Sequence, residues 1–242
     1  MTNVWTIYRR EMLSYFTSPI AYIFGIAFLV TLGVFFFLYN GFFMRANPEL
    51  RFYFYILPLA FVLLIPAVTM RLWSEEKKAG TLEMLMTLPL KSWEVVLGKF
   101  MAGYSVILLT LLLTLTVPLT VALTVDLDWG VVVTSYIGAF LLAGVYIALG
   151  AWISALTENQ VVALLISMVF LFVLWGIGFP HVVDFFNSMS NGLGRAIGWF
   201  GTSSHYESFI KGIVNPVDIV YALSLMAFFL ILNNFAVEWR KY

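Results

Sequence analysis

The sequence predicts an all-α polytopic membrane protein with six transmembrane helices. Hydrophobic residues make up 62% of the chain and charged residues 11%, against about 25% charged residues in soluble domains. Six stretches carry no Asp, Glu, Lys or Arg, and each is long enough to cross a hydrocarbon core about 30 Å thick. A charge at the bilayer centre costs roughly 2.5–3.5 kcal/mol, so spanning helices exclude charges. These stretches are residues 17–44, 52–70, 100–125, 129–157, 159–183 and 219–237.

One transmembrane domain is expected over residues 1–242, because six spans and their loops occupy nearly the whole length. An interfacial helix is predicted at residues 1–18, a short cytoplasmic helix at residues 75–89 and an apolar outer segment at residues 181–215. The spans themselves are placed at residues 19–40, 52–73, 94–124, 129–156, 159–180 and 217–238.

Lysine and arginine are distributed unevenly between the two sides of this topology, and their excess marks the cytoplasmic side. One side carries Arg9, Arg10, Arg71, Lys77, Lys78, Lys91, Lys99, Arg240 and Lys241, and the other carries Arg45, Arg51, Arg195 and Lys211. This bias places both termini in the cytoplasm and is typical of a bacterial inner membrane protein.

Ahead of the first span, apolar residues recur at helical spacing. The members of this face are Val4, Trp5, Tyr8, Met12, Tyr15 and Phe16. Glu11 lies within the same face and interrupts it. The pattern predicts an amphipathic helix in the cytoplasmic interface, and a simple juxtamembrane anchor is the alternative. Pro19 then marks the turn into the membrane.

Proline and glycine interrupt two of the spans. Pro58 and Pro66 fall inside the second span and predict kinks there. Gly176, Gly178 and Pro180 end the fifth span. The outer segment that follows is rich in apolar residues, which predicts short helices that dip into the outer leaflet.

The segment between the second and third spans is the most distinctive in the chain. Charged residues lead to a break at Gly80, and a short helix then runs until Pro89. Leu82, Leu85 and Met86 share one face of this helix at i, i+3, i+4 spacing. An isolated helix of this length is marginal in water. The apolar stripe fits either a groove on a partner protein or an ordinary interfacial loop, and the residues alone leave both interpretations open.

No catalytic, nucleotide or metal site is predicted, and no cofactor. The chain has no Gly-x-x-x-x-Gly-Lys-Ser/Thr loop and no nucleophile–base pair at membrane depth. Its two histidines, His181 and His205, are too few for a zinc site. A net charge of zero argues against a nucleic-acid partner. No ionisable residue is expected at mid-membrane, so the energy for any transport would enter from outside the membrane region.

The cytoplasmic segment and the start of the third span resemble the signature of ABC-2 type permeases, the membrane subunits of ABC transporters. The residues that carry the resemblance are Glu76, Gly80-Thr81-Leu82-Glu83, Leu88-Pro89, Glu94 and Gly98-Lys99. The opening, from Tyr8-Arg9-Arg10-Glu11 through Tyr15-Phe16-Thr17-Ser18-Pro19, is most similar to the gliding-motility-associated subgroup. Permeases of nitrous-oxide-reductase maturation are a related alternative.

This resemblance implies a permease that is not itself an enzyme, with ATP bound by a separate ABC ATPase subunit. It implies an elbow helix at the N-terminus, a coupling helix in the ATPase groove, a smaller contact at residues 155–160, and re-entrant outer helices that close the exit. A second permease half, identical or similar, would complete a pathway lined by the first, second and fifth spans. Beside the bilayer, an envelope or periplasmic protein is a further expected partner. The implied ATPase-coupling residues are Glu76, Gly80, Thr81, Leu82, Glu83, Leu85, Met86, Thr157 and Glu158.

Two other functions fit part of the pattern. The chain could serve as a membrane anchor or scaffold for an envelope machine of the gliding type, with the ATPase as regulator and no transport. An intramembrane lipid-modifying enzyme is the second alternative, and it would need catalytic groups at membrane depth that the sequence does not offer.

Overall fold

The computed structural model describes residues 2–39, 50–82, 90–190 and 192–239, and in these residues it contains helices and turns but no strand. In chain order the helices are α1 (Thr2–Thr17), α2 (Pro19–Val34), the π-helix η1 (Phe35–Tyr39), α3 (Arg51–Thr69), α4 (Arg71–Lys78), α6 (Ser92–Leu113), α7 (Thr116–Ala122), α8 (Trp129–Leu156), α9 (Gln160–Gly176), α10 (Pro180–Met189), α11 (Leu193–Trp199), α12 (Thr202–Ile210) and α13 (Pro216–Glu238). The predicted all-α polytopic class is confirmed.

Five segments of the described chain are long and apolar enough to cross a membrane. They are α2 with η1, α3 with α4, α6 with α7, α8, and α13. The fifth predicted span is represented by α9, which has 17 residues and is followed by α10 after a bend of 76°. Counting α9 and α10 as one broken span gives six.

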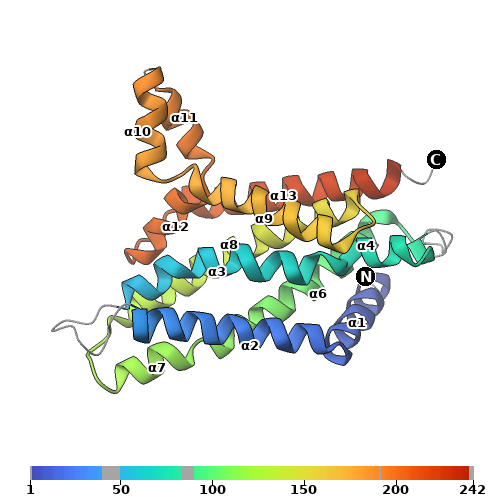
Figure 1. The fold of residues 1–242 in the computed structure, drawn as a ribbon, viewed down its shortest axis with the longest axis horizontal. Helices are drawn as coiled ribbons and strands as arrows, with labels where there is room; N and C mark the ends of the chain where they lie inside the picture. The colour runs from blue at the N-terminus through green and yellow to red at the C-terminus, as the bar shows by residue number, and fades with distance from the viewer. Residues whose placement is uncertain (1, 40–49, 83–89, 191, 240–242) are drawn as a thin grey trace.

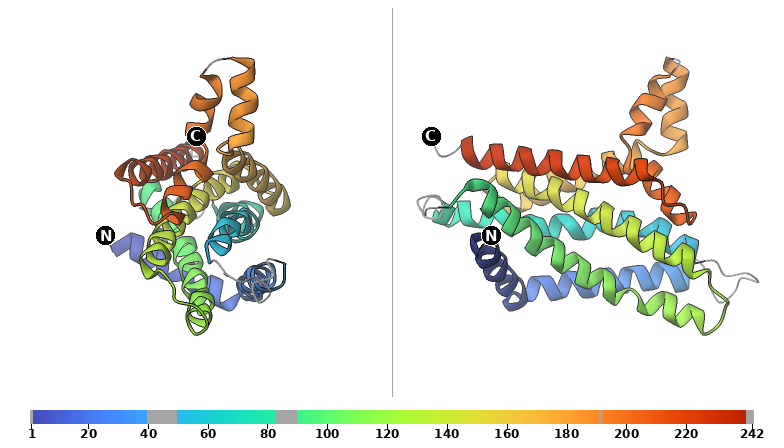
Figure 2. Two further views of the ribbon diagram at one scale, coloured as in Figure 1. Left: turned by 90° about the vertical axis from the view of Figure 1, so that its left-hand side faces the viewer. Right: turned by 180° about the vertical axis from the view of Figure 1, so that it is seen from behind.

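The spans run side by side along the longest axis of the molecule (Figures 1 and 2). The helix α1 and the C-terminal end of α13 lie at one end of the bundle, which we call the terminal end. The short helices α10, α11 and α12 lie at the opposite end, which we call the distal end. Both figures therefore place α1 and the C-terminal end of α13 on the same side of the spanning region.

Helix starts follow from local sequence. A proline occupies the first turn of α2, α10 and α13, where its missing N–H leaves no hydrogen bond unmade. Asp128, Asn159 and Asn215 precede α8, α9 and α13, and each side chain accepts a hydrogen bond from a backbone N–H of the first turn.

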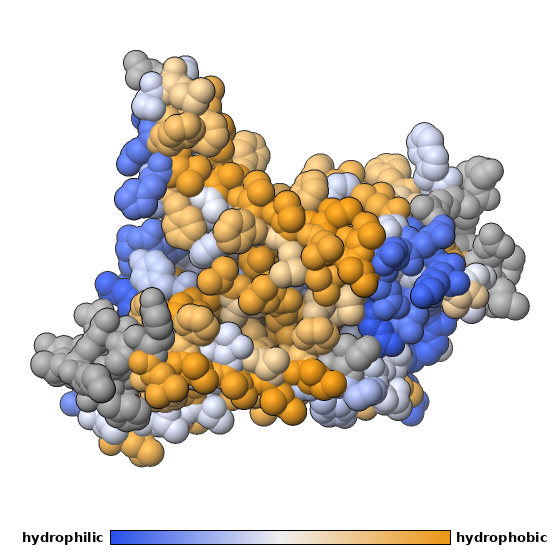
Figure 3. Space-filling view, in the orientation of Figure 1, coloured by the Kyte–Doolittle hydropathy of each residue, from blue (hydrophilic) through white to orange (hydrophobic). Residues whose placement is uncertain are grey.

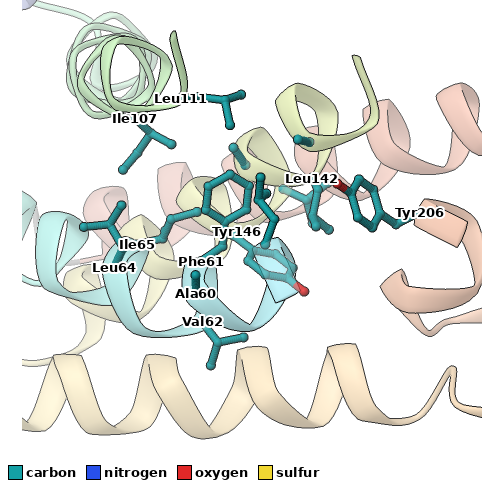
Figure 4. Packing of buried hydrophobic residues seen from close by; sticks show 14 of the residues in the cluster. Ala60, Phe61, Val62, Leu64, Ile65, Ile107, Leu111, Leu142, Tyr146 and Tyr206 are labelled. Atoms are coloured by element: carbon teal, nitrogen blue, oxygen red, sulfur yellow. The ribbon is translucent and has the colours of Figure 1, made fainter. Parts of the chain in front are cut away.

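The core is built around α3 and α8. Apolar side chains of α3, α6 and α8 meet there, with Tyr206 of α12 closing the distal side (Figure 4). Close approach depends on small residues of α8. A Cβ at Gly150 would lie 2.3 Å from Thr69 Oγ1, and one at Gly144 would lie 2.2 Å from the end of Met226. The sequence of α8 therefore admits α3 and α13 at short distance.

At the distal end, α10 and α11 form a helical hairpin that projects sideways from the bundle (Figure 1). We call it the arm. Glycines make its contacts close: a Cβ at Gly194 would lie 2.0 Å from the carbonyl oxygen of Val183, and one at Gly201 would lie 2.3 Å from Gly178. The outer segment thus contains short helices, as predicted, but α10 leaves α9 at a steep angle.

The base of the arm is held by His205 on α12. Its Nδ1 lies 2.6 Å from Asp218 Oδ1 and its Nε2 lies 2.8 Å from the carbonyl oxygen of Trp199. The ring also stacks on Tyr221 at 3.8 Å between centroids. These contacts join α11, α12 and α13.

On the face shown in Figure 3, the surface of the spans is largely apolar. Ile23 and Ile26 on α2 are each 61% exposed, and Val169 on α9 is 62% exposed. Exposed side chains of this kind along the length of a helix are what a bilayer solvates and water does not.

Candidate functional site

The terminal end gathers charged side chains from three helices around one buried lysine. Lys99, on α6, is 2% exposed, and its Nζ lies 3.0 Å from Glu11 Oε1 on α1 and 3.0 Å from Glu76 Oε1 on α4. Arg10 Nη2 contacts the same two oxygens at 2.7 and 2.8 Å. We call Arg10, Glu11, Glu76 and Lys99 the ionic cluster.

The charges of the ionic cluster balance. Two carboxylates face two cations, which offsets the cost of removing each charge from water. Burial disfavours the charged form of Glu11, yet Lys99 and Arg10 together hold its pKa below the usual value. Lys99 also lies 5.2 Å from the ring centre of Trp73, within the range of a cation–π contact.

Close packing brings α1 onto α6 beside the cluster. A Cβ at Gly98 would lie 2.8 Å from Ile7 Cγ2 and 3.1 Å from the carbonyl oxygen of Val4, so only glycine permits this approach. Tyr8 donates a hydrogen bond to Ser105 at 3.2 Å. These contacts bind the N-terminal helix to the start of the third span.

A one-residue turn at Met70 interrupts the helix between α3 and α4, and one serine of α8 bridges this break. Ser154 Oγ accepts hydrogen bonds from the N–H groups of Trp73 and Ser74 at 3.1 and 3.3 Å, and donates to the carbonyl oxygen of Met70 at 3.0 Å. The helix start at α4 would otherwise leave buried N–H groups without partners. Ser154 is itself fully buried.

Further bonds fix α4 on its other sides. Arg71 makes a two-pronged contact with Glu75, at 2.8 and 3.0 Å, and donates to Ser18 Oγ at 2.7 Å, between α1 and α2. Lys77 Nζ donates to the carbonyl oxygen of Ala155, near the end of α8. As a result, α4 is bonded to the N-terminal helices, to α6 and to α8.

The second predicted contact, Thr157 and Glu158, lies in the turn that joins α8 to α9. Thr157 Oγ1 accepts a hydrogen bond from the N–H of Asn159 at 3.2 Å, and Glu158 is exposed. Because Lys77 reaches Ala155, the end of α4 and this turn are neighbours at the terminal end.

The predicted helix at residues 75–89 differs from the structure at its start. Glu75 and Glu76 belong to α4, which continues the second span, and Glu76 faces the ionic cluster. Gly80 then turns with φ +69°, a conformation that favours glycine. Thr81, after the turn, is exposed, and its hydroxyl donates to the carbonyl oxygen of Glu76 at 3.2 Å.

Leu82 is buried, whereas a residue of an apolar stripe that docks into a partner would be exposed. Leu82 is 9% exposed and packs in a cluster with Ile7, Trp73 and Val96, so its side chain contributes to this chain's own core. The remaining predicted coupling residues, Glu83, Leu85 and Met86, lie outside the described residues.

Sequence reasoning missed the ionic cluster, although one signal was present. Glu11 interrupts the apolar face of the N-terminal helix, and in the structure that interruption faces Lys99. Lys99 directly precedes a long charge-free stretch, which hid its burial. The expectation that no ionisable residue lies at mid-membrane concerns another part of the molecule, because the ionic cluster lies at the terminal end of the bundle.

A second feature lies at the distal end, where a cavity of about 230 Å³ opens between α3, α9 and α12. Its wall is largely aromatic, with Tyr55, Trp175, Phe179 and Tyr206, and carries one carboxylate, Glu207. Glu207 accepts a hydrogen bond from Tyr55 at 3.4 Å and pairs with Lys211 at 2.8 Å.

Comparison with known proteins identifies a family. A family model described as an ABC-2 family transporter protein matches residues 5–236, which is nearly the whole chain. No curated protein matches the chain.

Proposed function

The chain belongs to the ABC-2 transporter family, and we propose that it forms a translocation pathway as a dimer driven by a separate ATPase subunit. Membership makes it the membrane permease component of an ABC transporter. The terminal end would face the cytoplasm, as the Lys and Arg distribution favours. ATP would be bound by the partner subunit, for which the segment after Gly80 would be the main contact.

The bonding of α4 is the observation that carries this proposal. A force applied to the segment after Gly80 reaches α4 first. From there it passes to α3 along the chain, to α1 and α6 through Glu76 and Lys99, and to α8 through Ser154. An ATPase that pushes on this segment would therefore move three membrane spans, formed by α3 with α4, α6 and α8, and the elbow helix as one body.

The distal cavity is consistent with a pathway between the second and fifth spans. Tyr55 and Pro58 of α3 and Trp175 of α9 line it. In a dimer, the cavities of both halves would lie toward the outer side. We also propose, from residues 8–19 alone, that the chain is closest to the gliding-motility-associated subgroup, in which an envelope protein would join the complex.

The test is affinity purification of the tagged chain from its native membrane, with mass spectrometry of the co-purified proteins. We expect a soluble ATPase with a P-loop, and a second, differently tagged copy of the chain if the dimer is symmetric. Glu83→Lys should release the ATPase. Glu238→Lys, the same charge change on α13 at the terminal end, should retain it. Equal recovery with both variants, or no ATPase with the folded wild type, would refute the coupling proposal.

Transport itself needs a second measurement, because a scaffold could also bind an ATPase. Stimulation of ATP hydrolysis in reconstituted vesicles by a candidate cargo would support a transporter. A constant rate with every fraction of the native envelope would favour the anchor interpretation.

A further inference from the structure

The arm formed by α10 and α11 does not continue the direction of the spans. The axes of α9 and α10 differ by 76°, so α10 runs nearly across the bundle (Figures 1 and 2). If the spans cross a bilayer, a helix at this angle lies close to the membrane plane.

Three faces of α10 carry three kinds of residue. Steps of about 100° per residue place Val183 and Asn187 toward α11, where both contact Gly194. An apolar face comprises Val182, Phe185, Phe186 and Met189. A third face, about 120° from the apolar one, comprises His181, Asp184 and Ser188. This division is typical of a helix that lies in an interface between water and lipid.

In the part of the chain that the structure describes, this apolar face is only partly covered. Phe185 is 62% exposed and Met189 is 71% exposed, and α10 has no buried residue. On α11, Leu193 is 42% exposed and Phe200, just after the helix, is 56% exposed. The arm therefore presents large apolar side chains to its surroundings.

The orientation of this face identifies what covers it. In Figure 3 the apolar side of the arm looks back along the bundle and is continuous with the apolar surface of the spans. Its hydrophilic side looks away, beyond the distal end. Because the apolar side of the arm joins the apolar surface of the spans, the lipid that covers the spans would also cover this side of the arm.

We propose that the arm lies flat in the lipid interface at the distal end, with Phe185 and Met189 among the acyl chains. Asp184 and Ser188 face the aqueous side. The arm would then extend the contact of the protein with this one leaflet sideways, beyond the spans. This proposal depends on the membrane-spanning bundle and is independent of ATPase coupling and of the dimer.

The absence of cysteine from the chain makes a direct test simple. Single-cysteine variants Phe185→Cys and Met189→Cys carry a nitroxide on the apolar face, and Asp184→Cys and Ser188→Cys carry it one residue away on the polar face. All four positions are exposed, so the label need not disturb packing. The labelled full-length chains are reconstituted in phosphatidylcholine–phosphatidylglycerol vesicles.

Collision of each nitroxide with oxygen, which concentrates in acyl chains, is compared with collision with a water-soluble nickel chelate. We expect oxygen to dominate several-fold at positions 185 and 189 and nickel to dominate at 184 and 188. Nickel access at all four positions would overturn the proposal, because the arm would stand in water. Loss of both collisions at 185 and 189 would also overturn it, since a protein would then cover the face.

Discussion

Lys99 Nζ lies 3.0 Å from Glu11 Oε1, although the two residues are 88 positions apart in the chain. This contact explains why a carboxylate occupies the apolar face of α1. It also gives the N-terminal helix a fixed position on the third span. Because Glu76 shares the same lysine, the position of α1 is tied to α4.

The first prediction concerns Lys99→Met. The change leaves Glu11 and Glu76 without their buried cation, and removal of one partner from a buried ion pair costs about 3–5 kcal/mol. Thermal unfolding in detergent should show a clear loss of Tm. Lys78→Met, an exposed lysine on α4, is the control and should leave Tm nearly unchanged. Adding Glu11→Gln to Lys99→Met should recover part of the loss, and strictly additive losses would contradict the pairing.

A second prediction is the pH dependence of stability. The pKa of Glu11 is lowered in the folded chain, so its carboxylate stabilises the fold above about pH 4.5, its ordinary pKa. That contribution is lost as the pH falls through the lower, folded-state pKa. Tm should therefore decrease with acidification, and Glu11→Gln should flatten the decrease. An unchanged slope in this variant would show that other groups govern it.

Two glycines in helices give the third prediction. Gly98→Ala places a methyl group 2.8 Å from Ile7 and should cost about 1–3 kcal/mol by forcing α1 away from α6. Gly33→Ala meets nothing within 4 Å and should be neutral or stabilise by about 0.4–1 kcal/mol. Unfolding measured side by side separates the contact from the general effect of alanine in a helix. Equal behaviour of the two variants would exclude a special role for Gly98.

The fourth prediction separates packing from coupling in the cytoplasmic segment. Leu82→Ala should lower stability by about 2–5 kcal/mol, because Leu82 is buried against Trp73 and Ile7. Leu85→Ala should leave stability unchanged and weaken ATPase recovery, as the resemblance to ABC-2 permeases implies. Measuring Tm and co-purification for both variants distinguishes the roles. If Leu82→Ala lost the ATPase but kept a normal Tm, Leu82 would contact the ATPase and would not belong to the core of this chain.

Much of the fold follows from local signals. The exclusion of charge from long stretches defines the spans, because hydrocarbon penalises charge wherever it occurs. Prolines in the first turns of α2, α10 and α13 mark helix starts. Gly80 marks a turn because its positive φ favours glycine. None of these signals needs a distant partner.

The candidate site depends on distant partners, and the sequence pattern could not supply them. Periodicity assigns Leu82 to an apolar stripe but does not say whether the chain itself covers it. A charge next to a span, such as Lys99, reads as a water-exposed flank unless Glu11 and Glu76 are known to surround it. The steep bend before α10 was signalled by Gly176, Gly178 and Pro180, but its direction depends on packing against α12.

The break at Met70 would ordinarily give the chain a point of rotation between span and cytoplasmic extension. One oxygen, Ser154 Oγ, holds the carbonyl before the break and two N–H groups after it. Rotation of α4 relative to α3 must therefore stretch three hydrogen bonds at once. The interruption in the helix acts as a rigid joint, and its stiffness is set by a hydroxyl of another helix.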